Sequence, residues 1–193
     1  MAMKLQLLLL LVLTVFFFND YLVAQKEEQE MSISREEVPK NALDFIEDQG
    51  LKGKVKWYRE TTSGKDSYES KFKREGKYYS VEFDTLGKIE DIEIAVRLRD
   101  LPKETRTIIK NSLSTEFKKF KWLKIQEQYT GTLEEMEKLF TRETAKLTLL
   151  YEVEVEGKLK DGGWEMFELL ISPKGEIIAK RKITLRPTDN LNY

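Results

Sequence analysis

The sequence predicts an α+β fold in which a helix followed by a four-stranded antiparallel meander occurs twice in tandem, with the helices packed on one face of the sheet. The first observation is a repeat, because two apolar-striped helices begin with similar triplets 63 positions apart, Val38-Pro39-Lys40 and Leu101-Pro102-Lys103. The second is that each stripe leads into a Lys-Trp pair, at Lys56-Trp57 and Lys121-Trp122. The third is that the hydrophobic period changes from 3.6 to 2 after each stripe, as it does where strands follow a helix.

Residues 1–24 have the pattern of a secretory signal peptide. Lys4 precedes an apolar run over residues 5–18, and cleavage is expected after Ala24. This run is shorter than the roughly 20 apolar residues that span a bilayer. We therefore expect a periplasmic or secreted protein without a stable membrane span after cleavage. Residues 25–34 are acidic and polar, and they predict a flexible tether.

The first repeat is predicted over residues 35–98. Ser34 is placed to cap its helix and Gly50 to end it. The apolar stripe of this helix has the spacing of a single face, at Val38, Ala42, Phe45, Ile46 and Gln49. Alternating polar and apolar residues then predict four strands, joined by short turns over residues 63–66, 75–77 and 85–88.

The second repeat is predicted over residues 99–186, followed by a C-terminal tail over residues 187–193. Its strands are expected at about 119–129, 145–159, 163–172 and 175–185. Between the first two of these strands it carries extra residues that the first repeat lacks. There, Thr132-Leu133-Glu134-Glu135 is a capping-box start, and an apolar stripe follows it. We therefore predict an inserted helix over about residues 132–142.

These motifs, in this order, resemble the exported PepSY-like domains, a family also called β-lactamase-inhibitor-like and typical of Bacteroidetes-type bacteria. The residues that carry the resemblance are Pro-Lys at the helix start, the Lys-Trp strand, and the strands over 68–72 and 79–84. The likeness covers about residues 35–186. It implies a helix-on-sheet fold and, by analogy with inhibitor proteins of this shape, binding through the open face of the sheet. The second repeat departs from the pattern through its insert and through Ile171-Ser172-Pro173, where the first repeat has Phe83-Asp84.

The side chains available for chemistry argue against an enzyme. The chain has no histidine and no cysteine, which excludes histidine-dependent triads, thiol nucleophiles and the ligands that zinc and copper prefer. The remaining route is a carboxylate pair such as Glu152 and Glu168, but such residues among Lys and Arg are more typical of a solvated sheet face. We expect no cofactor and no metal. Glu134, Glu135 and Glu137 fit the favourable charge at a helix N-terminus better than a calcium loop.

The charge pattern and the open sheet face bear on the kind of partner. The 33 basic and 34 acidic residues are interspersed, so no basic stripe indicates nucleic acid. Tyr58, Tyr78, Trp164 and Met166 fall on the strand phase opposite to the helix-facing residues, and they are the candidate partner-binding residues. Two interpretations remain open at this point. Either the inserted helix folds over Trp164 and Met166, or the face receives a protein or peptide.

These observations predict an exported, non-catalytic binding protein. In this hypothesis it occludes or inhibits an envelope or secreted protein through its sheet face. The alternative is a small-ligand-binding or envelope-sensing module with a pocket under the inserted helix.

Overall fold

The structure is a computed structural model that describes residues 24–26, 28–62, 64–141 and 143–184. The first half of the described chain holds two short N-terminal strands, a helix and four further strands. Their bounds are β1 Ala24–Lys26, β2 Glu28–Ile33, the 3-10 turn η1 Arg35–Glu37, α2 Lys40–Asp48, β3 Lys56–Thr62, β4 Lys65–Arg74, β5 Lys77–Phe83 and β6 Ile89–Ala95. The second half consists of the 3-10 turn η2 Leu98–Asp100, α3 Lys103–Glu116, β7 Lys119–Thr130, α4 Leu133–Thr141, β8 Thr148–Lys158, β9 Trp164–Ile171 and β10 Ile177–Ile183.

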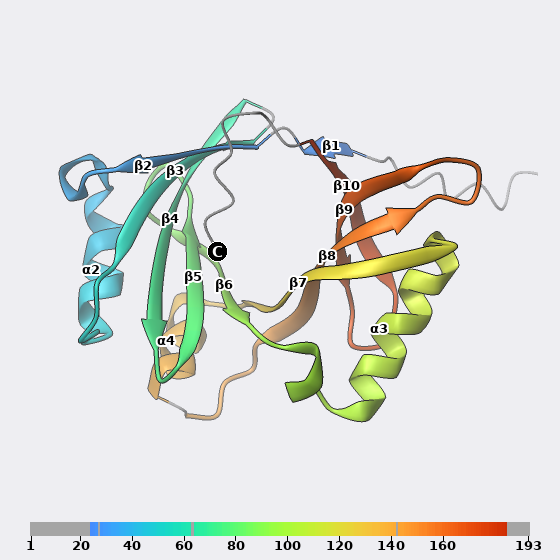
Figure 1. The fold of residues 1–193 in the computed structure, drawn as a ribbon. Helices are drawn as coiled ribbons and strands as arrows, with labels where there is room; N and C mark the ends of the chain where they lie inside the picture. Colours follow the sequence, from blue (N-terminus) through green and yellow to red (C-terminus); the bar gives the residue numbers. More distant parts are fainter. Residues whose placement is uncertain (1–23, 27, 63, 142, 185–193) are drawn as a thin grey trace, which may run out of the picture.

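The fold is α+β, as the sequence predicts, and its strands form one sheet. The described strands lie in the order β1-β10-β9-β8-β7-β6-β5-β4-β3-β2. All neighbouring pairs from β10 to β2 are antiparallel, and the short β1 pairs in parallel with β10. Figure 1 shows that the sheet is strongly bent, with α2 and α3 on the outside of the bend. We call the face inside the bend the inner face and the face that carries the helices the outer face.

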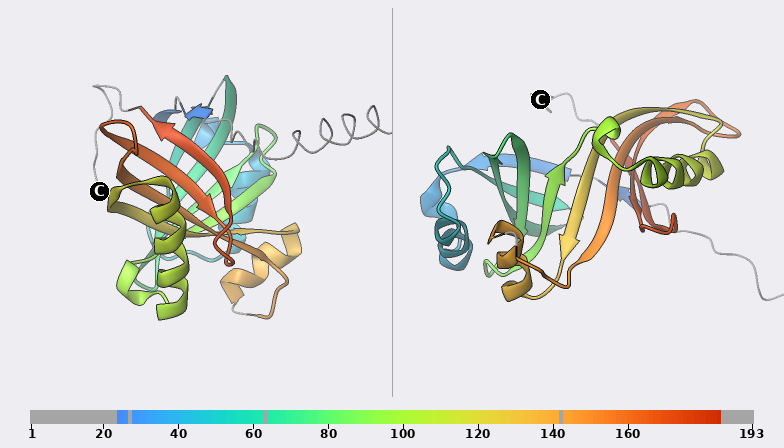
Figure 2. Two further views of the ribbon diagram at one scale, coloured as in Figure 1. Left: turned by 90° about the vertical axis from the view of Figure 1, so that its right-hand side faces the viewer. Right: turned by 90° about the horizontal axis from the view of Figure 1, so that it is seen from below.

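The outer face of the first half is packed under α2 and α4. Phe45 of α2 and Phe140 of α4 meet edge to face with ring centroids 6.0 Å apart, and both are buried together with Phe72 and Phe83 of the sheet. Met136 of α4 is 1% exposed in the same cluster. The inserted helix therefore lies on the outer face beside α2, and Figure 2 shows the two helices near each other. The interpretation that it covers Trp164 and Met166 on the inner face is wrong.

The outer face of the second half has its own core under α3. Ile109 and Leu113 of α3 are fully buried against strand residues such as Val153, Val155 and Leu169. Along β8, buried outer residues alternate with the inner residues Glu152, Glu154 and Glu156, as in a sheet covered on one side. On β9 the inner phase is more apolar and holds Trp164, Met166, Glu168 and Leu170.

The starts of the helices follow the capping patterns, with one shift. The sequence predicts Ser34 as the cap of the first helix, but Ser34 instead precedes the turn η1, where its backbone N–H donates to Glu37 Oε2 at 2.9 Å. The helix α2 begins only at Lys40, after Pro39. In α4 the capping box is present, because the Thr132 N–H donates to Glu135 Oε2 at 2.9 Å and the Glu135 N–H donates to Thr132 Oγ1 at 3.3 Å.

The turns that follow β5 and β9 share one hydrogen-bond pattern. Asp84 Oδ1 accepts from the N–H groups of residues 86 and 88, and Ser172 Oγ accepts from those of residues 174 and 176. Gly87 and Gly175 adopt positive φ angles of 76° and 89° in these turns. Ser172 therefore supplies a hydroxyl where Asp84 supplies a carboxylate, and the two turns have the same hydrogen-bond pattern.

The N-terminal residues join both edges of the sheet. The sequence predicts a tether over 25–34, but Glu28–Ile33 form β2 in antiparallel pairing with β3, so this prediction does not hold for residues 28–33. Only one residue separates β1 on β10 from β2 on β3, and consecutive Cα atoms are about 3.8 Å apart. The two edges of the sheet therefore approach each other at this end, where Figure 1 shows β1 and β2 running between the two halves.

Two predicted segments lie outside the described residues: the signal peptide apart from its last residue, and the C-terminal tail 187–193. Among the described helices, none is long and apolar enough to cross a bilayer.

Candidate functional site

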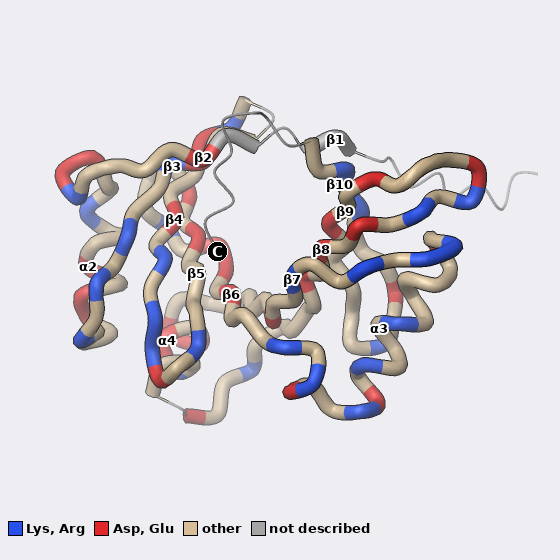
Figure 3. The backbone as a smooth tube through the Cα atoms, in the orientation of Figure 1, with Lys and Arg blue, Asp and Glu red and all other residues tan. Residues whose placement is uncertain are grey.

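The inner face is the candidate functional site, and it is rich in carboxylates. Alternation along the strands places one acidic residue after another at its centre. Figure 3 marks acidic positions in red along the strands of both halves. The central acidic residues are Glu69, Glu82, Asp91, Glu93, Glu152, Glu154 and Glu168. Two lysines, Lys71 and Lys124, lie between them. Glu69, Glu93 and Glu168 are 4 to 6% exposed, which is unusual for charged residues.

The first group of carboxylates surrounds a lysine. Oxygen atoms of Glu30, Glu60 and Glu69 lie within 4.8 Å of one another. Lys71 Nζ lies 2.8 Å from Glu69 Oε2 and 3.1 Å from Glu30 Oε2. Burial alone would lower the pKa of Lys71, but the neighbouring carboxylates outweigh it and hold this pKa above its ordinary value. The lysine therefore stays charged and neutralises part of the group.

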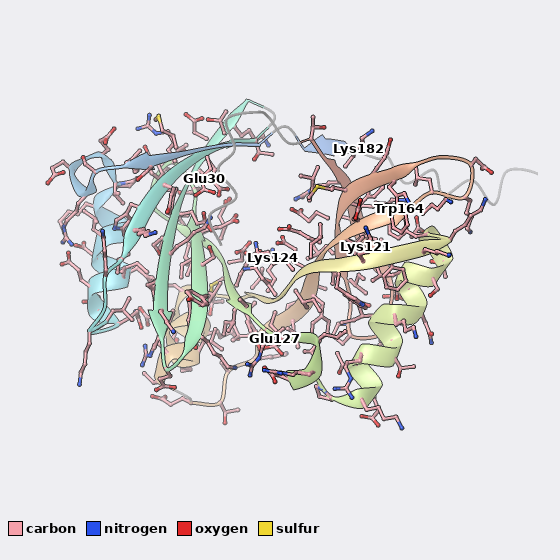
Figure 4. The ribbon with its side chains drawn as sticks, viewed as in Figure 1. Glu30, Lys121, Lys124, Glu127, Trp164 and Lys182 are labelled. Carbon is pink, nitrogen blue, oxygen red and sulfur yellow. The ribbon has the colours of Figure 1, made fainter. Side chains whose placement is uncertain are left out.

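A second lysine is held in the same way on β7. Lys124 Nζ lies 3.4 Å from Glu154 Oε1 and 4.0 Å from Glu152 Oε1, and Figure 4 shows Lys124 near the middle of the bend. Burial opposes its charge, but Glu152 and Glu154 raise its pKa above the ordinary value. Glu168 pairs with Arg181 at 3.1 Å. Glu152 and Glu168, the catalytic pair considered from the sequence, thus each face a basic side chain, as in cross-strand ion pairing.

A second carboxylate group lies on β5 and β6. Glu82 stands directly opposite Asp91, and oxygen atoms of Glu82, Asp91 and Glu93 lie within 4.8 Å of one another. Gln128 Nε2 donates to Asp91 Oδ2 and to Glu93 Oε1, at 3.3 Å each. Asp91 Oδ1 is buried and has no hydrogen-bond partner among the described residues. Burial and the neighbouring carboxylates, Asp91 foremost, raise the pKa of Glu93 to about 8. Burial and Glu82 likewise raise the pKa of Asp91.

The four residues predicted from the sequence lie on the inner phase of their strands. All four lie near the starts of strands that run in the same direction, Tyr58 in β3, Tyr78 in β5, and Trp164 and Met166 in β9. They are not level in register, because Tyr79 lies level with Ile171, at the other end of β9 from Trp164. Tyr78 is 64% and Trp164 41% exposed, whereas Tyr58 and Met166 are half-buried. Three strands, β6, β7 and β8, lie between Tyr78 on β5 and Trp164 on β9, so the two residues belong to different halves of the sheet.

Each of the three aromatic residues carries a lysine over its ring. Lys71 Nζ lies 4.9 Å from the ring centroid of Tyr58, and Lys73 Nζ lies 5.3 Å from that of Tyr78. Lys121 Nζ lies 4.9 Å from the ring of Trp164, and Figure 4 shows these two side chains together. Burial and Glu30 raise the pKa of Tyr58. The rim of the inner face thus combines aromatic rings with basic groups, while its centre is acidic.

The buried carboxylates are the part of the site that sequence reasoning missed. A signal was present, because the predicted turn around Gly87 places Glu82 opposite Asp91, and like charges opposite each other in a sheet are unfavourable. The alternating charged residues of these strands are equally typical of a solvated sheet face. Only the bend of the sheet, which the sequence does not show, brings them close together.

Two shallow hollows, each about 390 Å³, lie near the start of β3 and the end of α2. They are lined by residues such as Arg35, Val55 and Trp57 and by none from 132–142. Neither hollow therefore supports a pocket under the inserted helix.

The fold and this face define the class: an α+β protein whose bent antiparallel sheet carries helices outside and charged side chains inside. No family model matches the chain, and no curated protein matches it.

Among solved structures, the chain is similar to a DUF2874 family protein from Bacteroides ovatus ATCC 8483, with 15% identity and a TM-score of 0.49, over 75% of this chain and 88% of that one. A DUF2874 family protein from Bacteroides uniformis ATCC 8492 has 16% identity and a TM-score of 0.49, over 75% and 89%. A protein from Bacteroides eggerthii DSM 20697, whose name assigns it to the periplasm, has 12% identity and a TM-score of 0.49, over 78% and 93%.

Proposed function

We propose that this is an exported, non-catalytic binding protein whose inner face receives a basic segment of an envelope or secreted protein and thereby occludes it. The observation that carries the proposal is the combination of an acidic centre with exposed aromatic residues, Tyr78 and Trp164, on the same face. Lys- and Arg-rich segments complement such a charge, and exposed aromatic residues are the anchors that dominate binding energy.

The chemistry of the face supports binding rather than catalysis. Lys71, Lys124 and Arg181 are each paired with carboxylates, as in structural cross-strand ion pairs. The export part of the proposal rests on the signal-peptide pattern in residues 1–24.

We also infer that the chain consists of two tandem PepSY-like units. The order of a 3-10 turn, a helix and four strands occurs twice, and the second copy is interrupted by α4 between its first two strands. The matching turns at Asp84 and Ser172 support the same inference.

The proposed function is tested with a fluorescent peptide of sequence (Gly-Lys-Ala-Arg)₃, using anisotropy at 150 mM salt. We expect saturable binding, and we expect Trp164→Ala and Tyr78→Ala to weaken it by about tenfold each, as for anchor residues. Leu123→Ala is the matched control, since Leu123 is also 45% exposed but carries no role in the proposal. It should leave binding unchanged.

The readout separates binding from folding. Trp164→Ala should shift the melting temperature by less than about 3 °C, because the side chain is already substantially exposed. Equal binding of an acidic peptide of the same length, or undiminished binding by both aromatic variants, would contradict the proposal.

A further inference from the structure

The two hollows near the end of α2 adjoin each other. Both are lined by Arg35, Val55 and Trp57, so they form one groove. The groove runs from the edge of the sheet, where β2 ends and β3 begins, to the C-terminal end of α2. Each hollow has a volume of about 390 Å³, which lies within the range of small-molecule sites. We call this feature the α2–β3 groove.

The end of the α2–β3 groove at the sheet edge is basic. Lys54, Lys56 and Arg35 line it, and none of the described carboxylate side chains does. Arg35 is paired with Glu47, which lines the other end. Lys54 and Lys56 are exposed, and neither forms an ion pair within the part of the chain that the structure describes. Figure 3 shows basic positions in blue along the segment that joins α2 to β3.

The strand register leaves this basic end open to a ligand. β2 pairs with β3 only as far as Ile33, which stands opposite Trp57, so no described strand lies beside residues 54–56 on that side. On the other side, Lys56 stands opposite Lys71 of β4. Like charges opposite each other in a sheet are unfavourable, so an anion placed at Lys56 lowers a repulsion that the fold itself contains.

The other end of the α2–β3 groove is apolar. Leu43 and Ile46 of α2 line it together with Leu51 of the following loop. Val55 and Trp57 line both hollows, so they continue this apolar wall to the lysines. Leu43, Leu51 and Val55 are only half-buried, so a ligand can cover apolar surface that now faces water.

A basic end next to an apolar end selects an amphiphilic anion. The lysines attract an anionic head group, and removal of an alkyl chain from water at the apolar end is favourable. A cationic head group would be repelled, and a ligand without an alkyl chain would leave the apolar end uncovered.

We propose that the α2–β3 groove binds a single-chain anionic amphiphile of the fatty-acid class. Its carboxylate lies at Lys54 and Lys56, and its alkyl chain passes Val55 towards Leu43 and Leu51. The site goes beyond the proposed partner binding and does not depend on it. Tyr78 and Trp164, whose variants test the partner binding, do not line the groove, so the two proposals can fail independently.

The test is isothermal titration calorimetry with sodium decanoate, decyl maltoside and decyltrimethylammonium, which combine a ten-carbon chain with an anionic, a neutral and a cationic head group. We expect one saturable site for decanoate with a dissociation constant below about 1 mM. Decyl maltoside should bind about fivefold more weakly, and the cation should not bind. Hexanoate, which has the same head group and a shorter chain, should bind at least tenfold more weakly than decanoate.

Two double variants with the same change of charge make the test specific. Lys54→Gln/Lys56→Gln should weaken decanoate binding by about fivefold and leave the binding of decyl maltoside unchanged. Lys118→Gln/Lys119→Gln is the matched control, since both lysines are exposed in the other half of the molecule. It should bind decanoate as the parent does. All four lysines are exposed, so each double variant should melt within about 3 °C of the parent.

The apolar end is tested by Leu51→Ala, which should weaken the binding of decanoate and of decyl maltoside by a similar factor of about threefold. If this variant does not fold, the comparison of hexanoate with decanoate in the parent protein tests the same contact.

Four results would overturn the site. They are the absence of saturable heat up to 5 mM decanoate, equal binding of the three head groups, equal binding of hexanoate and decanoate, and an equal loss of decanoate binding in the two double variants. Binding of an acidic peptide that depends on Lys54 and Lys56, without binding of decanoate, would assign these lysines to a protein partner and would also overturn it.

Discussion

At the residue scale, buried charge on the inner face follows two different rules. Lys71 is surrounded by carboxylates that outweigh the cost of its burial, so its charged form is favoured in the folded protein. Glu93 is buried among like charges, so its neutral form is favoured and its pKa rises to about 8. The inner face of the first half, on β4 and β6, therefore holds one side chain that stabilises the fold when ionised and one that destabilises it when ionised.

The raised pKa of Glu93 predicts how stability depends on pH. Between about pH 4.5 and pH 8 the folded protein binds more protons than the unfolded chain, so the free energy of unfolding falls as pH rises across this window. In EDTA, the melting temperature should be about 5 °C lower at pH 8 than at pH 5.5. Glu93→Gln should flatten this dependence, as measured by thermal unfolding at both pH values. An unchanged slope in Glu93→Gln, with Glu137→Gln as the control, would refute this assignment.

At the element scale, α4 illustrates what the sequence can and cannot predict. Its position follows from local signals, because the Thr132 capping box is followed by an apolar stripe. Its place in the fold depends on which apolar surface is left uncovered, and this is not local information. The outer face offers Phe45, Phe72 and Tyr79 around Phe140, whereas Trp164 on the inner face stands beside charged residues.

The packing of α4 predicts a clear contrast between two of its residues. Phe140→Ala removes a side chain that is 6% exposed and contacts three aromatic rings, so it should cost about 3–5 kcal/mol in the free energy of unfolding. Leu133→Ala, at a position 54% exposed on the same helix, should cost less than about 1 kcal/mol. Urea unfolding followed by circular dichroism measures both values. Similar costs for the two variants would mean that α4 does not pack as described.

At the scale of the whole molecule, the bend of the sheet decides the character of the inner face. The alternation of the strands and the turns at Gly76, Gly87 and Gly175 can be predicted from the sequence, because they depend on residues that are close together in the chain. The bend of the sheet and the pairing of residues 24–33 with both of its edges cannot be predicted in this way, because they depend on residues far apart in the chain. Residues 28–33 pair with β3 through their backbone, so a polar composition that resembles a tether conceals a strand.

Removal of residues 25–33 should therefore affect both edges of the sheet. The variant loses β2, the Glu30 partner of Lys71 and the contact of Ile33 with the first core. Hydrogen exchange measured by mass spectrometry should accelerate in β3 and at residues 181–183 of β10, while β5 and β8 keep their protection. Met31→Ala, at a site 51% exposed, is the control that should leave β3 protected. Unchanged exchange in the truncated chain would contradict the role of this segment.

The junction of β1 and β2 also sets an order of events during biosynthesis. Residues 24–33 are among the earliest that a ribosome makes, but the partner of β1 is the last described strand, which is made more than 140 residues later. Until then the nascent chain can pair β2 with β3 but cannot pair β1 with β10, so the backbone of β1 stays unpaired. The pairing of β10 with β1 is therefore the last contact of the sheet that the chain can complete. A chain whose translation stops before β10 cannot form this pairing, even if the rest of the sheet has formed.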